Sequence, residues 1–337
     1  MIDIILNNLI PFIIILTILV FVHELGHYLI ARKNGVKVEV FSIGFGKELF
    51  GFTDKNETRW KFSLIPLGGY VKMHGDLDEA STKKNESSEI IPGQSFHEKT
   101  IYQRSMILVA GPAANFIFSF VLLIFINFFY GISIDKPEIN YVEKDMPAYN
   151  SGLKEGDLII EIDGNKIEKF SQIKRLIENK NNQSINLLFS RDGKVSEVNV
   201  KVINNIIGIR GKIENKKLNL LDSFNESLLQ IYNFTKLTLV GVYEIITGNR
   251  GTDELGGPIR IAELSGDFWS KGLHSTLWFM MIISLNLGLI NLFPIPMLDG
   301  GHLFLNFIEF INGGPLKRKY LEIAHTFGFF ILISLMI

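Results

Sequence analysis

The sequence predicts a polytopic α-helical membrane protein with four transmembrane helices, a membrane-associated β segment and one inserted α+β domain. The 337 residues are 47% hydrophobic, which is high for a soluble enzyme. Residues 140–205 instead have the mixed composition of a small soluble domain. The net charge of -1 gives no indication of nucleic-acid binding. Because cysteine is absent, any metal site must use nitrogen and oxygen ligands.

Four apolar runs are candidate spans, judged against the roughly 20 residues that a bilayer core requires. Residues 9–31 carry one formal charge, Glu24, and residues 105–134 and 272–298 carry none. Residues 323–337 number only 15, so we expect the natural chain or its last helix to continue. The predicted domains are a first span (1–34), a β-rich loop (35–100), a second span (101–134), an α+β domain (135–210), an amphipathic helical region (211–271), a third span (272–302) and a turn with the fourth span (303–337).

Basic residues beside the spans predict their orientation. Arg32 and Lys33 follow the first span, Arg104 precedes the second, and residues 317–319 precede the fourth. Basic residues concentrate on the cytoplasmic side of a membrane. We therefore expect the N-terminus and the α+β domain outside and the β-rich loop inside. No basic segment precedes the first run, so we interpret it as a retained helix and not as a signal peptide.

The β-rich loop contains two predicted strands. Residues 36–52 and 58–73 alternate apolar and polar side chains and are rich in β-branched and aromatic residues. Gly44 and Gly46 permit a tight turn or a close backbone approach. Residues 76–99 are polar and rich in Ser, Glu and Lys, which predicts a mobile loop.

The α+β domain is predicted from two hairpins and a helix. The hairpins turn at Asp163-Gly164 and at Asp192-Gly193, and residues 170–179 between them have helical spacing. This order, headed by SGLKEGDLIIEIDG, resembles a bacterial PDZ domain, a fold that binds extended peptides by strand addition. The alternative is a spacer that binds nothing.

Residues 223–247 predict an amphipathic helix that Lys236 and Glu244 interrupt. An isolated charge at the centre of a bilayer is costly. We therefore expect this helix at the outer membrane interface or against the spans.

The first span contains His23-Glu24-Leu25-Gly26-His27, which fits H-E-x-x-H. Positions i and i+4 share a helix face, so both imidazoles can reach one metal ion while the glutamate accepts a proton from water. The alternative is a chance match. A glutamate inside a span favours function, because an intramembrane charge is costly without one.

A hydrolytic zinc site needs a third protein ligand. Asp299 is the best candidate, because it follows the third apolar run and lies, like the two histidines, near the predicted inner end of a span. Pro294 and Pro296 are expected to break the helix before it. His302 is a rival ligand, and a simple helix cap is the alternative role for Asp299.

Several motifs occur in a fixed order along the chain, from HELGH through SIGFG, PLGGYVKM, GPAANF and LGGPIRIA to NLFPIPMLDGGHL. Together they resemble the bacterial site-2 protease family, in the branch of the regulator-of-sigma-E protease, over essentially the whole chain. One departure is that the best-known members carry two PDZ domains and this chain has room for one.

The resemblance implies an intramembrane zinc metalloprotease in which His23, His27 and Asp299 hold Zn²⁺. Glu24 would take a proton from water and pass it to the leaving amine. The expected location is the bacterial inner (cytoplasmic) membrane, with the PDZ-like domain on the periplasmic side and the active site near the cytoplasmic side.

A substrate helix must unwind before its peptide bonds become accessible. We expect the segment with Gly44 and Gly46 to pair with the unwound stretch by strand addition. Asn291 and Pro294 resemble the family's substrate-holding motif, although Asn291 would also suit a bond between helices. Asn115 is predicted to pack the spans together, because its neighbours are small.

The implied substrates are single-span proteins with the N-terminus inside, such as trimmed anti-sigma factors or remnant signal peptides, in regulated intramembrane proteolysis. The other expected partners are the lipid bilayer and an extended peptide on the PDZ-like domain, which would act as a gate. One rival hypothesis is a non-proteolytic PDZ-bearing membrane scaffold, which would have no use for Glu24. A second is a zincin with a soluble catalytic domain, which would place the H-E-x-x-H motif outside the spans.

Overall fold

The computed structural model describes residues 5–75, 92–251 and 256–314, with the single positions 323, 326, 328 and 330. Most of the fourth predicted span and most of the predicted mobile loop therefore lie outside the described residues. The chain divides into two compact units. One comprises Met1–Ile126 with Leu220–Ile337, and the other is Asn127–Asn219.

Among the described residues, three helices are long and apolar enough to cross a membrane. They are α2 (Ile10–Lys33), which continues a short π-helix η1 (Ile5–Leu9), then α3 (Ile101–Tyr130) and α8 (Leu273–Asn291). All three coincide with spans predicted from the sequence.

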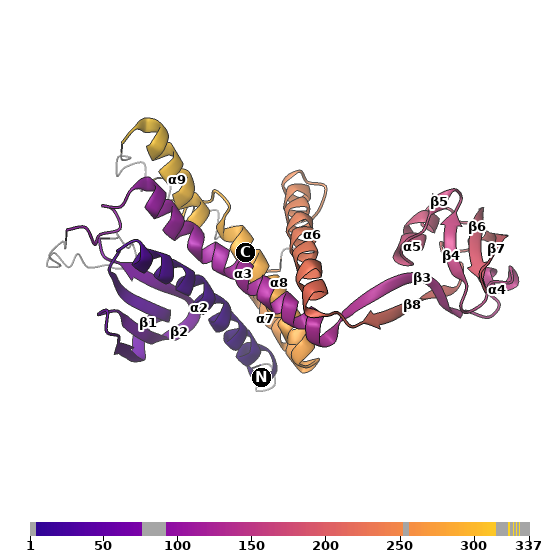
Figure 1. The fold of residues 1–337 in the computed structure, drawn as a ribbon, viewed down its shortest axis with the longest axis horizontal. Helices are drawn as coiled ribbons and strands as arrows, with labels where there is room; N and C mark the ends of the chain where they lie inside the picture. The colour runs from indigo at the N-terminus through magenta and orange to yellow at the C-terminus, as the bar shows by residue number, and fades with distance from the viewer. Residues whose placement is uncertain are drawn as a thin grey trace. The chain divides into compact units, whose positions relative to one another are not determined.

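Small residues bring these three helices close together. A methyl group at Gly26 of α2 would lie 2.3 Å from the carbonyl oxygen of Ala110 in α3. A methyl group at Gly288 of α8 would lie 2.9 Å from the carbonyl oxygen of Pro112, also in α3. Glycine at both crossings lets the backbones approach, as is common between membrane helices. Figure 1 shows α3 running along α2.

The two strands predicted in the inner loop are confirmed as β1 (Val38–Thr53) and β2 (Arg59–Met73), which pair antiparallel. Both strands bend, so each contributes two segments to the sheet. Ile43 of β1 consequently lies opposite both Gly69 and Phe62 of β2. The bend in β1 falls at Gly44, whose φ of 88° suits glycine. Within the described part of the chain, no strand pairs with the outer edge of residues 69–73.

The amphipathic segment forms α6 (Leu220–Ile246), followed by α7 (Pro258–Ser270). Phe234 of α6 packs edge-to-face on Trp278 of α8, with ring centroids 5.4 Å apart. The Thr238 hydroxyl donates to the Asn286 side-chain oxygen, also in α8, at 3.1 Å. The helix therefore lies against a candidate span, which is one of its two predicted placements.

The second unit is an antiparallel sheet with two short helices. Its strands lie in the order β7-β6-β4-β3-β8, and β5 pairs with β4. Both predicted hairpins and the predicted helix are present. Its elements are β3 (Ile132–Val142), α4 (Pro147–Asn150), β4 (Leu158–Ile162), β5 (Asn165–Lys166), α5 (Ser171–Ile177), β6 (Ser184–Arg191), β7 (Lys194–Lys201) and β8 (Ile209–Lys216).

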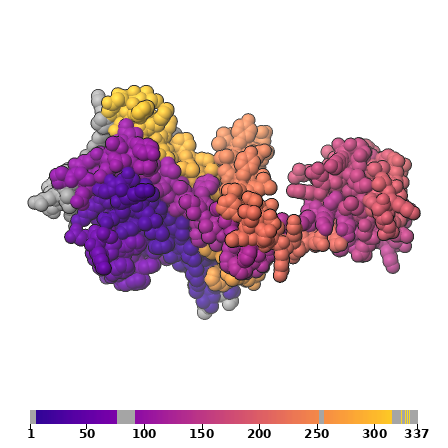
Figure 2. Space-filling model, in the orientation of Figure 1, coloured from indigo at the N-terminus to yellow at the C-terminus, as the bar shows by residue number. Residues whose placement is uncertain are grey.

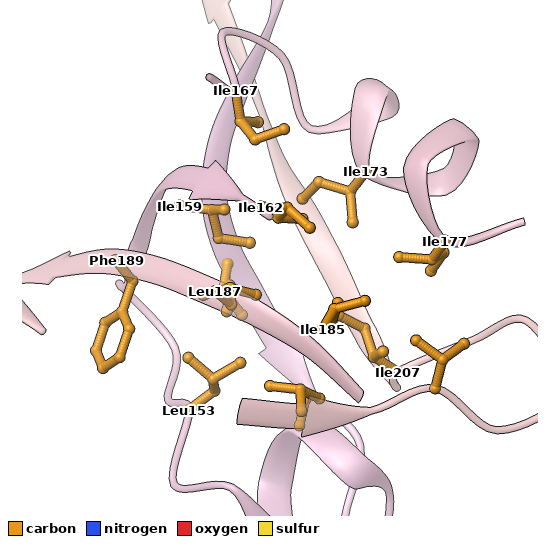
Figure 3. Packing of buried hydrophobic residues seen from close by; sticks show 14 residues of the cluster. Leu153, Ile159, Ile162, Ile167, Ile173, Ile177, Ile185, Leu187, Phe189 and Ile207 are labelled. Atoms are coloured by element: carbon orange, nitrogen blue, oxygen red, sulfur yellow. The ribbon is translucent and has the colours of Figure 1, made fainter. Parts of the chain in front are cut away.

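Isoleucine dominates the core of this unit. Ile159, Ile162 and Ile185 of the sheet are fully buried and point toward the helix residues Ile173 and Ile177 (Figure 3). The sheet also runs past residue 210, where the sequence placed the domain boundary, because β8 pairs with β3.

The third predicted span divides into two helices. α8 ends at Asn291, and α9 (Asp299–Asn312) begins at Asp299, where the sequence had placed the end of a span and then a turn. The connection contains Pro294 and Pro296, which cannot donate backbone hydrogen bonds. Gly301 lets the first turn of α9 pack on this connection, since a methyl group there would lie 2.2 Å from the Ile295 carbonyl oxygen.

An ion pair joins α9 to the start of α3. Arg104 Nη2 lies 2.7 Å from Glu309 Oε1, and both side chains are largely buried. In Figure 2 the yellow atoms of α9 lie next to purple atoms of the first unit. This contact helps to hold the helix that begins with Asp299.

Candidate metal centre

Two histidines face each other across one turn of α2. His23 and His27 are both buried, and their Nε2 atoms lie 3.2 Å apart. The spacing of four residues places both rings on one face of the helix, as the sequence predicted.

Asp299 completes the group from the first turn of α9. Its Oδ2 lies 3.2 Å from His23 Nε2, and its Oδ1 lies 3.4 Å from His27 Nε2. Among the described residues, these three form the one group of His, Cys, Asp or Glu side chains arranged to hold a metal ion. The rival candidate His302 is not part of this group.

The second nitrogen of each ring is also engaged. His27 Nδ1 lies 2.8 Å from the carbonyl oxygen of Ile107 in α3, so this nitrogen carries the proton and donates it. His27 Nε2 therefore has a free lone pair. His23 Nδ1 lies 3.1 Å from the side-chain amide of Asn115, also in α3.

One donor atom from each of the three residues lies within 4.8 Å of the other two, close enough to share one metal ion. Bonds of about 2.0–2.1 Å in a tetrahedron separate neighbouring ligand atoms by roughly 3.3 Å. The two Nε2 atoms are 3.2 Å apart, and each lies 3.2 or 3.4 Å from a different oxygen of the Asp299 carboxylate. Position 111 also keeps this space open, because a methyl group on Gly111 would lie 2.2 Å from His27 Nε2. Two imidazoles and one carboxylate are a donor set that suits zinc and leaves a fourth position free.

Glu24 lies beside these three residues, on the same helix. It is close enough to interact electrostatically with all three, and the backbone of Val71 in β2 lies near its carboxylate. The sheet reaches this position because Gly69 has no side chain. A methyl group there would lie 3.2 Å from Glu24 Cγ.

Comparison with known proteins identifies the family. The chain matches peptidase family M50 over residues 11–335. This chain belongs to peptidase family M50. The M50 match confirms the predicted enzyme class, and with the three apolar helices it makes this chain an integral membrane protein.

Relatives of this M50 peptidase cover nearly its whole length. A Rickettsia conorii protein whose name includes zinc metalloprotease is 37% identical over 98% of this chain and 96% of its own. A Rhizobium meliloti protein with the same words in its name is 33% identical over 96% of this chain and 92% of its own. The zinc metalloprotease RasP of Geobacillus kaustophilus is 30% identical over 98% of this chain and 96% of its own.

Among solved structures, similarity is found to a part of the M50 peptidase. The PDZ domain of an SdrC-like protein from Listeria monocytogenes is 25% identical, and the match covers 24% of this chain and 90% of that domain, with a TM-score of 0.21.

Four further candidate residues lie apart from the three ligands. Asn291 is half-buried at the end of α8, and Pro294 is exposed in the connection to α9. Gly44 and Gly46 lie at the bend of β1. Among the described residues, no hydrogen bond or ion pair joins these four to the histidines or to Asp299.

The sheet corrects one detail of the sequence interpretation. Strand addition was expected along residues 42–46, but Ser42 and Ile43 already have β2 partners on both sides. The free edge nearest Glu24 is the other segment of β2, residues 69–73. Periodicity alone cannot reveal this, because the double pairing depends on the two bends.

The sequence interpretation missed two residues at the centre. Asn115 was predicted to pack the spans together, and Gly111 is one of the small neighbours on which that prediction rested. Both lie in GPAANF, where an amide inside an apolar run was the available signal.

Proposed function

We propose that this M50 peptidase is an intramembrane zinc endopeptidase of the site-2 type that cuts substrates within their membrane-spanning segment. Its metal is zinc, in agreement with the names of its relatives and with the donor set of the site. The observation that carries the proposal is the group of His23, His27 and Asp299, which is built on a helix apolar enough to span a membrane.

His23, His27 and Asp299 hold the ion, which when bound supplies a Lewis acid that acidifies water and polarises a carbonyl group. Glu24 accepts a proton from the attacking water and delivers it to the leaving amine. The backbone N–H of Val71 lies near the Glu24 carboxylate and would help to orient it.

The free edge of β2 is the proposed place for the unwound substrate. A peptide in a membrane helix has its backbone groups paired internally and must lose those bonds to be cut. Residues 69–73 offer replacement bonds by strand addition, and they pass directly beside Glu24. Gly44 and Gly46 support this edge by bending β1. Asn291 and Pro294 would contact the substrate from the α8–α9 connection.

We further propose the setting of the reaction. The enzyme lies in the bacterial inner membrane and acts in regulated intramembrane proteolysis on single-span proteins with the N-terminus inside, such as trimmed anti-sigma factors or remnant signal peptides. The second unit, as a PDZ-like domain on the periplasmic side, admits substrates whose outer part has been removed.

The test uses purified protein in detergent and a model single-span substrate. We expect about one zinc per chain in both wild type and Glu24→Gln, but cleavage only by wild type. Glu244→Gln in α6 makes the same change away from the site and should leave both properties unchanged. Zinc-free protein without cleavage would contradict the proposal. Undiminished cleavage by Glu24→Gln would show that Glu24 is not the group that transfers the proton.

A further inference from the structure

We propose that Asn115 is a positioning residue that fixes the tautomer of His23 by accepting the ring's Nδ1–H on its side-chain oxygen. This inference rests on the proposed zinc site and adds a residue to it. The Asn115 side chain would then hold Nε2 of His23 toward the ion without touching the ion or the substrate.

The chemistry of imidazole sets the requirement. A neutral ring has one nitrogen that donates and one with a free lone pair. When Nε2 of His23 gives its lone pair to a metal, Nδ1 must carry the proton and needs an acceptor. The group that faces Nδ1 is the amide of Asn115, at 3.1 Å. Asn115 is fully buried, so water does not compete with its side chain as the hydrogen-bond partner of His23 Nδ1.

The orientation of the amide responds to the metal. In the structure its nitrogen faces His23, and the oxygen Oδ1 is buried without a hydrogen-bond partner. The two ends of an amide have nearly the same shape, so a half-turn exchanges them within the same space. After the half-turn, Oδ1 accepts from His23 Nδ1–H. The amide nitrogen then loses its partner, so this orientation is favoured when the metal occupies the Nε2 lone pair.

His27 supplies an internal comparison. Its Nδ1–H donates to the carbonyl oxygen of Ile107, one of the residues of α3, and its Nε2 points to Asp299. The Nε2 of His23 likewise points to Asp299, and its Nδ1 also faces a residue of α3. The two ligands are therefore oriented in the same way, one by a backbone oxygen and the other by Asn115. Acceptors behind metal-bound histidines are common and raise metal affinity.

The backbone of Asn115 is held by two serines. Its carbonyl oxygen accepts from the Ser119 hydroxyl at 2.8 Å and from the Ser284 hydroxyl of α8 at 3.0 Å. Gly288 of α8 leaves little free space here, since a methyl group on it would lie 3.2 Å from Asn115 Cβ. A residue fixed in this way can hold the ring of His23 in one orientation.

The test compares Asn115→Asp, which keeps an acceptor, with Asn115→Leu, which removes it at similar volume. Zinc affinity is measured in detergent by competition with a chromophoric chelator, and the visible spectrum of the cobalt-substituted protein reports ligand geometry. We expect Asn115→Leu to weaken zinc binding about 10- to 100-fold and to alter the cobalt spectrum. Asn115→Asp should stay within a few-fold of wild type.

The order of the two variants separates positioning from packing. If Asn115 only packed the helices, Leu would be tolerated and the buried charge of Asp would be the more damaging change. Tighter zinc binding by Asn115→Leu than by Asn115→Asp, or equal zinc affinity in wild type and Asn115→Leu, would overturn the inference. If Asn115→Leu does not fold, Asn115→Ala removes the amide without added bulk and takes its place.

Two controls complete the experiment. Asn286→Leu removes another amide between helices, the one that pairs with Thr238, and should leave zinc affinity unchanged. Wild-type protein that binds no zinc would contradict the proposed metal site itself. Tight zinc binding by wild type and equally tight binding by Asn115→Leu would contradict only the role of Asn115.

Discussion

At the residue scale, Gly111 shows how one missing side chain keeps the metal centre open. A methyl group at this position would lie 2.2 Å from His27 Nε2, far inside the usual contact distance of about 3.5–4.0 Å. Either the His27 ring or the crossing of α2 and α3 would have to move. We therefore expect Gly111→Ala to weaken zinc binding by about 10-fold or more, measured by chelator competition.

The control for this change is Gly241→Ala in α6. A methyl group there would meet only the end of the Arg250 side chain, at 3.3 Å, and that side chain can move. Alanine favours a helix interior over glycine, so this variant should be neutral or slightly stabilising. Normal zinc affinity in Gly111→Ala would show that the His27 ring has more freedom than the structure indicates.

A second prediction at this scale concerns Asp54, in the turn between β1 and β2. Burial alone would raise the pKa of its carboxyl, but the Trp60 indole N–H and the backbone N–H groups of Thr58 and Asn56 donate to it and lower the pKa below its usual value. Such a group stabilises the fold above its unfolded pKa of about 4, and this contribution is lost as the pH falls through the folded value.

Asp54→Asn should therefore lower the free energy of unfolding by about 1 kcal/mol at pH 7, and the difference from wild type should shrink below about pH 4. Thermal unfolding in detergent at several pH values measures this. Asp267→Asn changes an exposed aspartate of α7 and serves as the control. A difference from wild type that is independent of pH would mean that charge is not the cause.

At the element scale, the sequence predicted the helices better than the way they are joined. The H-E-x-x-H spacing fixed the faces of His23 and His27, because a regular helix leaves no choice for residues four apart. The start of α9 at Asp299 was not predicted, because Pro294 and Pro296 indicate that the preceding helix ends but not where the next helix begins. The contact between Asn115 and His23 was also missed, because it depends on how closely α3 approaches α2.

The ion pair between α3 and α9 gives the prediction at this scale. The Arg104 and Glu309 side chains are only 12% and 17% exposed, so removing one charge leaves the other buried without its partner. We expect Arg104→Met to lower the free energy of unfolding by about 3 kcal/mol. It should also weaken zinc binding, because α9 carries Asp299.

The double variant Arg104→Met with Glu309→Met is the matched control. It removes both charges and leaves neither unpaired, so most of the lost stability should return. Thermal unfolding and zinc affinity of the single and double variants form a double-mutant cycle. A double variant as unstable as the sum of the two single ones would indicate that the ion pair does not couple the two helices.

At the scale of the whole molecule, the sequence predicted a membrane unit with an inserted sheet domain, and two compact units are present. The hairpins of the second unit were predictable because Asp-Gly pairs favour the tight turns seen at Asp163 and Asp192. The pairing of β3 with β8 was not, since these strands are far apart in the sequence. The pairing of β1 with two segments of β2 was not predictable either, because the sequence pattern does not show which strand segments pair.

This pairing makes a clean deletion possible, which tests the second unit as a gate. The backbone N–H of Glu143 donates to the Gly208 carbonyl oxygen at 2.8 Å, and Val142 lies opposite Ile209. Residues 144–207 can therefore be replaced by a short Asn-Gly turn that closes β3 and β8 as a hairpin. The first unit keeps all three proposed zinc ligands, so zinc affinity should not change.

The shortened protein should cut a trimmed substrate as wild type does, because the centre lies wholly in the first unit. It should in addition cut a substrate that retains its outer domain, which we expect wild type to reject. Cleavage of both substrates by purified protein in detergent and in vesicles measures this. If the shortened protein cuts the trimmed substrate and still rejects the untrimmed one, selection by size must come from the first unit and not from the second.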